Sequence, residues 1–77
     1  MTVYFVVGII YREIGTAETS TECYKIINNF LKERNYKSPY WRISKYDDHE
    51  WIDVGSHTQF FEIYEKPLEE KKWDTSQ

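Results

Sequence analysis

One segment of this chain has the repeat of an amphipathic helix, and a single helix limits the folds open to the rest. Thr19 to Glu22 fits a capping box, in which the two side chains satisfy backbone N–H groups, so the helix is predicted to begin there. Asn35 is predicted as a left-handed cap, and Pro39 prevents continuation. The apolar residues between them recur at three- and four-residue spacing, as Cys23, Ile26, Ile27, Phe30 and Leu31.

The segments around this helix are rich in β-branched and aromatic residues, which favour strands. They are Thr2–Arg12, Tyr40–Tyr46, Glu50–Gly55 and Thr58–Lys66. The predicted order is therefore β-α-β-β-β, an α+β fold with a small single-layer antiparallel sheet and the helix packed on one face. Residues 1–66 are predicted to form a single domain. Residues 67–77 form a C-terminal tail, for which a short helical turn begun at Pro67, with Trp73 docked on the sheet, is one option.

The first strand segment, Thr2–Arg12, is apolar on both of its alternating faces. Such a strand is either central and covered on both sides, or half of its surface meets another molecule. In a chain of 77 residues the second option is preferred, because the core of so short a domain is small. A homodimer through this strand is the corresponding prediction.

Composition narrows the class of protein. The single Cys23 can form no internal disulfide and no cysteine-based zinc site, which favours a reducing, cytoplasmic location. The apolar run near the start lacks the flanks of a signal peptide and the length of a membrane span. A net charge of −3 argues against general affinity for nucleic acid, which depends on Lys and Arg.

The stretch YDDHEWIDVGSHTQFF holds the residues that suggest a catalytic or metal site. Four carboxylates, Asp47, Asp48, Glu50 and Asp53, are close in sequence, but strand alternation directs neighbours to opposite faces. His49 and His57 are about 25 Å apart along an extended strand, too far for a catalytic pair. His49 is interpreted as a turn residue, and Ser56 lies in no nucleophile motif. The interpretation is a hairpin with an acidic tip, with no metal, no cofactor and no enzymatic activity.

Rings and cations alternate in KSPYWRISKY, and they are the better candidates for function. Alternation places Trp41 and Ile43 in the core and leaves the other side outward, where one of Phe60 or Phe61 can join it. A patch of this kind exceeds what most monomers expose. The predicted binding residues are Tyr40, Arg42, Tyr46, Trp51 and, in the following loop, His57.

Two hypotheses for function follow. The first is a small non-enzymatic binding protein that inhibits or redirects a larger protein partner; its size, acidity and aromatic content resemble small phage-encoded host-takeover or anti-defence proteins. The alternative is a binder of a nucleotide or single-stranded nucleic acid through an aromatic sheet face, as a homodimer. Acidic residues around the aromatic face would favour a protein target, and basic residues would favour nucleotides.

Overall fold

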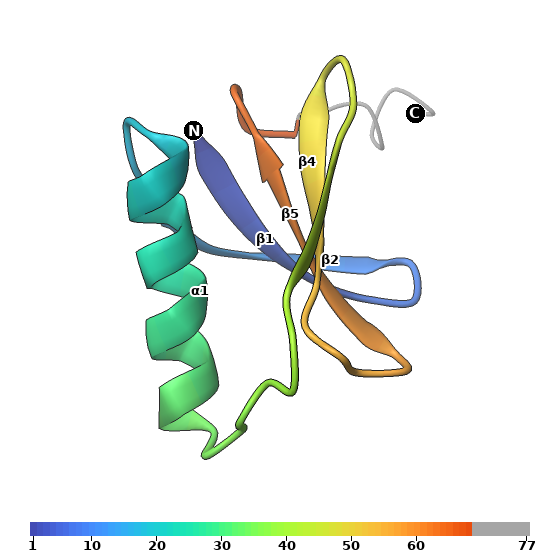
Figure 1. The fold of residues 1–77 in the computed structure, drawn as a ribbon. Coiled ribbons are helices and arrows are strands. Elements are labelled where there is room, and N and C mark those ends of the chain that lie inside the picture. Colours follow the sequence, from blue (N-terminus) through green and yellow to red (C-terminus); the bar gives the residue numbers. More distant parts are fainter. Residues whose placement is uncertain (69–77) are drawn as a thin grey trace.

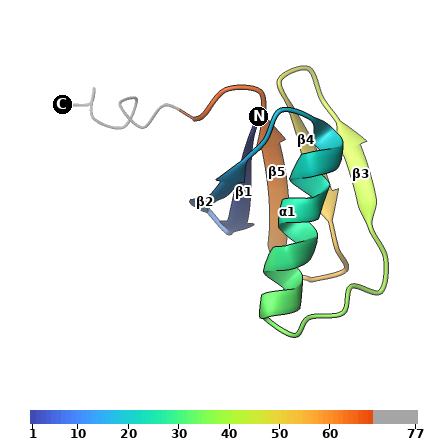
Figure 2. The same ribbon diagram turned by 90° about the vertical axis from the view of Figure 1, so that its left-hand side faces the viewer.

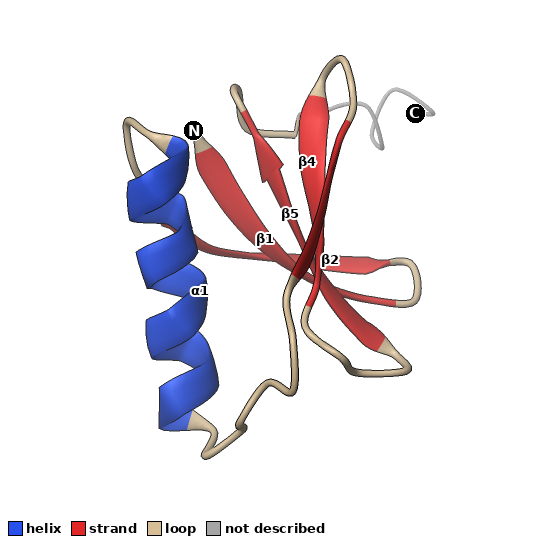
Figure 3. Ribbon diagram, viewed as in Figure 1, coloured by secondary structure: helices blue, strands red, loops and turns tan. Residues whose placement is uncertain are grey.

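The fold is a five-stranded antiparallel sheet with one helix packed across one of its faces (Figures 1 and 2). The computed structural model describes residues 1–68. The strands lie in the order β2-β1-β5-β4-β3, and each neighbouring pair is antiparallel. The predicted α+β class is therefore confirmed. The elements, coloured by type in Figure 3, are β1 (Thr2–Val7), β2 (Ile10–Thr16), α1 (Ser20–Glu33), β3 (Arg42–Lys45), β4 (His49–Asp53) and β5 (Gln59–Tyr64).

The predicted element order was wrong at one place, because Thr2–Arg12 is a hairpin and not one strand. The chain reverses at Gly8, whose φ of 63° is open to glycine without the steric cost that other residues meet. The sequence concealed this turn because apolar residues continue on both sides of the glycine. β1 thereby lies between β2 and β5 and is buried on both faces by the helix on one side and by neighbouring strand side chains on the other. The preferred prediction, that half of this strand meets another molecule, was therefore wrong for β1.

Local capping explains where α1 begins and ends. The Thr19 side chain accepts a hydrogen bond from the Glu22 N–H at 3.2 Å, and the Glu22 carboxylate accepts one from the Glu18 N–H at 3.2 Å. At the other end Asn35 has the predicted left-handed conformation, with φ of 57°. The Tyr36 N–H then reaches back to the Leu31 carbonyl at 3.0 Å, as in a Schellman motif.

The core lies between α1 and the strands that it covers. Cys23, Ile27 and Leu31 are buried on the helix, as its periodicity predicted. They pack with Val3, Phe5, Ile52, Val54, Phe61 and Ile63 of the sheet side. Within residues 1–68 no helix has the length and apolar character that crossing a membrane requires.

The assignment of core residues near β3 needs one correction. Trp41 is half-buried and packs against Tyr24 of α1, with ring centroids 6.1 Å apart. Ile43, however, is 40% exposed, although it pairs with the fully buried Ile52. The reason is that α1 contacts β1, β2 and β5 and does not extend over β3, so the edge strand has no cover. Burial there depends on the position of the helix and not on alternation alone.

The end of the described chain returns to the sheet. The Leu68 N–H donates to the Tyr4 hydroxyl at 2.7 Å. The predicted docking of Trp73, and the greater part of the predicted helical turn begun at Pro67, lie outside the described residues.

Candidate binding site on the outer face of the sheet

The face of the sheet opposite α1, called the outer face below, carries most of the functional candidates. Residues that pair across neighbouring strands point to the same face of the sheet. On this face Glu62 pairs with Tyr4 on β1 and with Trp51 on β4, and Tyr64 pairs with His49. The side chains of this face from the five strands include Tyr4, Val6, Tyr11, Arg42, His49, Trp51, Asp53, Phe60, Glu62 and Tyr64.

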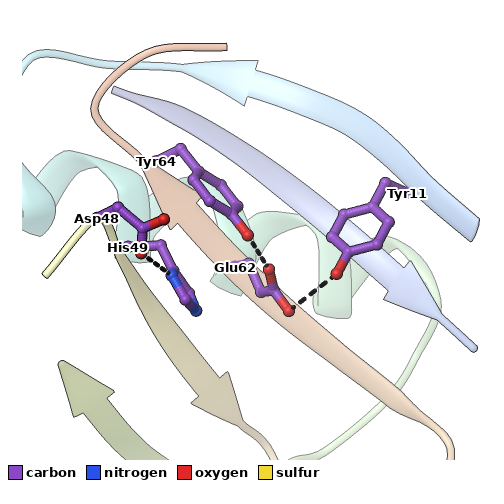
Figure 4. Close-up of polar contacts among 5 residues, drawn as sticks. All are labelled: Tyr11, Asp48, His49, Glu62 and Tyr64. Atoms are coloured by element: carbon purple, nitrogen blue, oxygen red, sulfur yellow. Dashed lines mark hydrogen bonds and ion pairs between the residues drawn. The ribbon is translucent and has the colours of Figure 1, made fainter. Parts of the chain in front are cut away.

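Glu62 is the central polar residue of the outer face. Its carboxylate accepts a hydrogen bond from the Tyr64 hydroxyl at 2.6 Å and a longer one from the Tyr11 hydroxyl at 3.4 Å (Figure 4). Glu62 is only 8% exposed. Burial and the hydrogen bond to Glu62 raise the pKa of Tyr64, and burial and the charge of Glu62 raise the pKa of Tyr11. Both hydroxyls are therefore held as neutral donors toward the carboxylate.

His49 connects this centre to the β3–β4 turn. Its ring stacks between Tyr46 and Tyr64, with centroids 4.9 Å from each. Its Nδ1 lies 2.6 Å from an Asp48 carboxylate oxygen, also drawn in Figure 4. The hydrogen bond with His49 lowers the pKa of Asp48. The interpretation of His49 as a turn residue was wrong: it is the first residue of β4, and its ring belongs to the aromatic row.

Two further aromatic contacts extend the outer face. Trp51 packs against Phe60 with ring centroids 5.0 Å apart. Phe61 is instead fully buried on the helix side, so of the two phenylalanines it is Phe60 that joins the outer face. Tyr4 meets Tyr11 and Tyr64 edge to face, at centroid distances of 6.2 and 5.8 Å. The result is two groups of rings, and Glu62 is the cross-strand partner of Tyr4 in one and of Trp51 in the other. The first is the row of Tyr11, Tyr4, Tyr64, His49 and Tyr46, and the second is the pair of Trp51 and Phe60.

The structure brings some of the predicted binding residues together and separates others. Tyr46 lies in the row of rings that includes His49, and Trp51 lies in the pair with Phe60. The Arg42 guanidinium lies 5.5 Å from the centre of the Tyr40 ring, and Tyr40 is 48% exposed. His57 is exposed in the loop before Gln59, whereas His49 pairs with Tyr64 at the other end of β5. His57 therefore does not join the group around Tyr46.

Sequence reasoning missed Glu62, Tyr64, Tyr11 and Tyr4 as site residues. A signal for Glu62 was present in QFFEIY, where alternation sets it between Phe60 and Tyr64 while Phe61 and Ile63 face the other way. Tyr11 had no such signal. It reaches the outer face only because the chain folds back at Gly8 and places β2 beside β1.

The four carboxylates considered for a metal site do not converge. Glu50 points to the helix side, where it accepts hydrogen bonds from Tyr24 and Ser20. Asp53 accepts one from the Gly55 N–H at 2.9 Å, and Asp48 pairs with His49. Among residues 1–68 no group of three or more His, Cys, Asp or Glu side chains could hold a metal ion.

Charge on the outer face is predominantly acidic. Glu62 and Asp53 lie on it, and Glu13 stands opposite Tyr4 on β2. Arg42 is the basic residue that the strands place there. No family model matches this chain, and no curated protein or solved structure matches it significantly.

Proposed function

We propose that this chain is a small non-enzymatic binding protein that docks a larger protein partner on its outer face and inhibits or redirects it, in the manner of a phage-type host-takeover or anti-defence protein. The observation that carries the proposal is the group of rings around Glu62 on a face that α1 leaves uncovered. A few residues carry most of the binding energy at protein interfaces, and tryptophan and tyrosine are enriched among them. The acidic surroundings favour a protein surface over a phosphate backbone.

The non-enzymatic character is supported by the separation of the reactive side chains. The Cys23 thiol is buried on α1, and burial raises its pKa, which keeps it protonated. The Ser56 hydroxyl oxygen accepts hydrogen bonds from the Thr58 and Gln59 N–H groups and acts as a loop cap. His49 lies at the other end of the sheet. We assign the protein to the cytoplasm on its single buried thiol.

The alternative, binding of a nucleotide or single-stranded nucleic acid, is favoured by one observation. The Arg42 guanidinium and the exposed Tyr40 ring form a cation and stacking pair, which suits a phosphate and a base. A homodimer, predicted with this alternative, would use β2, where Ile10 and Tyr11 are exposed beside the exposed turn residue Ile9.

The test compares two tryptophans on opposite faces. The tagged chain is purified from its native host, the protein that co-purifies in a fixed ratio is identified, and that partner is purified and titrated calorimetrically with each variant. Trp51→Ala on the outer face is expected to weaken binding by roughly thirtyfold, about 2 kcal/mol, as for an interface hot spot. Trp41→Ala, which changes the helix side, is expected to lower thermal stability and to bind as wild type does.

Two results would count against this proposal. If Trp41→Ala lost the partner while Trp51→Ala kept it, the docking face would be the helix side. If a nucleotide or a single-stranded oligonucleotide bound in the same calorimeter, and Arg42→Gln abolished that binding, the alternative function would replace the first.

A further inference from the structure

Glu62 is a buried charge without a cation beside it. Within residues 1–68, no Lys or Arg nitrogen lies within 4.0 Å of its carboxylate. Removing a carboxylate from water costs several kcal/mol unless an opposite charge and hydrogen bonds compensate for it. Tyr64 and Tyr11 supply hydrogen bonds but no charge. Hydrogen bonds to the buried carboxylate are therefore present, but the opposite charge is missing.

The position of Glu62 directs that charge outward. It lies on β5, the middle strand of the sheet, and faces away from α1. Each of its oxygens accepts one tyrosine hydroxyl and keeps a further lone pair. Figure 4 shows the carboxylate between the two tyrosine rings. Glu62 is only 8% exposed, so a ligand that approaches this face meets the surrounding rings first and, behind them, a carboxylate with acceptor capacity on both oxygens.

The walls around the carboxylate suit a flat cation. Trp51 and Tyr4 are the cross-strand neighbours of Glu62, and Tyr64 and Tyr11 are its donors. Cations are attracted to the faces of such rings. A guanidinium is planar, is weakly hydrated, stacks on rings and pairs with both oxygens of a carboxylate, whereas an ammonium group is compact and strongly hydrated. The nearby acidic residues Asp53 and Glu13 add attraction for a basic segment.

We propose that Glu62, with Trp51, Tyr64 and Tyr11 around it, receives an arginine side chain of the partner protein. This inference rests on the proposed function and names the chemistry of the partner: a basic segment whose arginine inserts between the rings. The arginine supplies the charge that the two tyrosines cannot, and its guanidinium stacks on the surrounding rings.

The direct test uses small probes on the full chain. Acetyl-Gly-Arg-Gly-amide, the lysine analogue and the uncharged citrulline analogue are titrated into isotopically labelled protein and followed by NMR. The arginine probe is expected to shift the Trp51 indole signal and the backbone signals of Glu62 and Tyr64 saturably, and the citrulline probe is expected to bind roughly tenfold more weakly or not at all. A lysine response as strong as the arginine response would overturn the preference for a guanidinium.

The matched variants are Glu62→Gln and Glu50→Gln. Both replace a carboxylate that accepts a tyrosine hydroxyl at 2.6 Å, but they lie on opposite faces of the sheet. Glu62→Gln is expected to reduce the affinity for the arginine probe about tenfold, and Glu50→Gln is expected to leave it unchanged. Equal binding by Glu62→Gln and wild type would overturn the proposal.

The same variants separate this inference from the proposed function. If the identified partner binds Glu62→Gln normally but loses affinity for Trp51→Ala, the outer face is the docking site and the arginine assignment is wrong. If both variants bind the partner as wild type does, the proposed docking face itself is wrong. If both lose affinity while Glu50→Gln does not, both proposals stand.

Discussion

Glu50 and Glu62 are the same residue in nearly the same local setting, on opposite faces of one sheet. Each accepts a tyrosine hydroxyl at 2.6 Å and a second hydroxyl at a longer distance. The donors of Glu50, Tyr24 and Ser20, both come from α1, so that carboxylate joins the helix to β4. The donors of Glu62 come from strands of the same sheet. The first arrangement joins two layers, whereas the second stays within the sheet and leaves the charge on the face that α1 does not cover.

The largest effect is expected from Phe61, the sequence neighbour of Glu62 that points the other way. Phe61 is 0% exposed and lies 5.4 Å from the Phe5 ring and 5.7 Å from the Phe30 ring, between centroids. Phe61→Ala is expected to lower the free energy of unfolding by about 3–5 kcal/mol, because it leaves a cavity in the core. Urea denaturation measures this loss. A loss below about 1 kcal/mol would mean that the two faces do not differ as described.

On the outer face, removing a donor and removing the charge should have unequal effects. Tyr64→Phe leaves the Glu62 carboxylate with only the longer bond to Tyr11, and it is expected to cost about 1–3 kcal/mol. Glu62→Gln removes the charge that lacks a cation, while its amide oxygen can still accept the Tyr64 hydroxyl, so we expect a change below about 1 kcal/mol. Urea denaturation curves of the two variants measure both losses in stability. A greater loss in Glu62→Gln would show that the carboxylate already has a cation within the chain.

On the helix side, removing the donor and replacing the carboxylate should lower the free energy of unfolding by similar amounts. Tyr24→Phe removes the shorter of the two hydrogen bonds that join α1 to Glu50 on β4, and Glu50→Gln weakens the same bond, so each is expected to cost about 1 kcal/mol. In the double variant the two costs should be less than additive, since both residues take part in one hydrogen bond. Full additivity in this cycle would indicate that the two side chains act independently.

The smallest expected effect is a loss of stability at alkaline pH. Burial and the bond to Glu50 raise the pKa of Tyr24 to about 12 from its ordinary 10.0, and burial and Glu62 raise that of Tyr64. In the unfolded chain these hydroxyls lose their protons near pH 10, while the folded chain retains them. The Tyr24 contribution to stability is therefore complete below pH 10 and is lost as the pH rises through about 12, and the Tyr64 contribution changes in the same direction. Tyr24→Phe and Tyr64→Phe should each make stability fall less steeply with rising pH, as measured by unfolding followed with circular dichroism. If stability falls as steeply with pH in both variants as in wild type, the two tyrosines do not have raised pKa values.

Much of the fold could be predicted from local patterns. The limits of α1 follow from Thr19, Glu22 and Asn35, whose capping chemistry acts within a few residues of the chain. The α+β class follows from one amphipathic helix beside strand-forming segments. The placement of Trp51 on the outer face follows from alternation. The sequence missed the turn at Gly8, because a glycine between apolar residues reads equally well as the middle of a strand.

The sequence by itself therefore determined which residues are helical, where the helix is capped, and which side chains alternate along each strand, because these depend on neighbours close in the chain. Only the tertiary structure decided which face is covered, that Ile43 stays exposed, and that Tyr11 and Tyr64 converge on Glu62. Tyr11 and Glu62 are 51 positions apart and meet through the antiparallel register of β2, β1 and β5. Contacts of that range depend on how strands pair and where one helix rests, which no local pattern encodes.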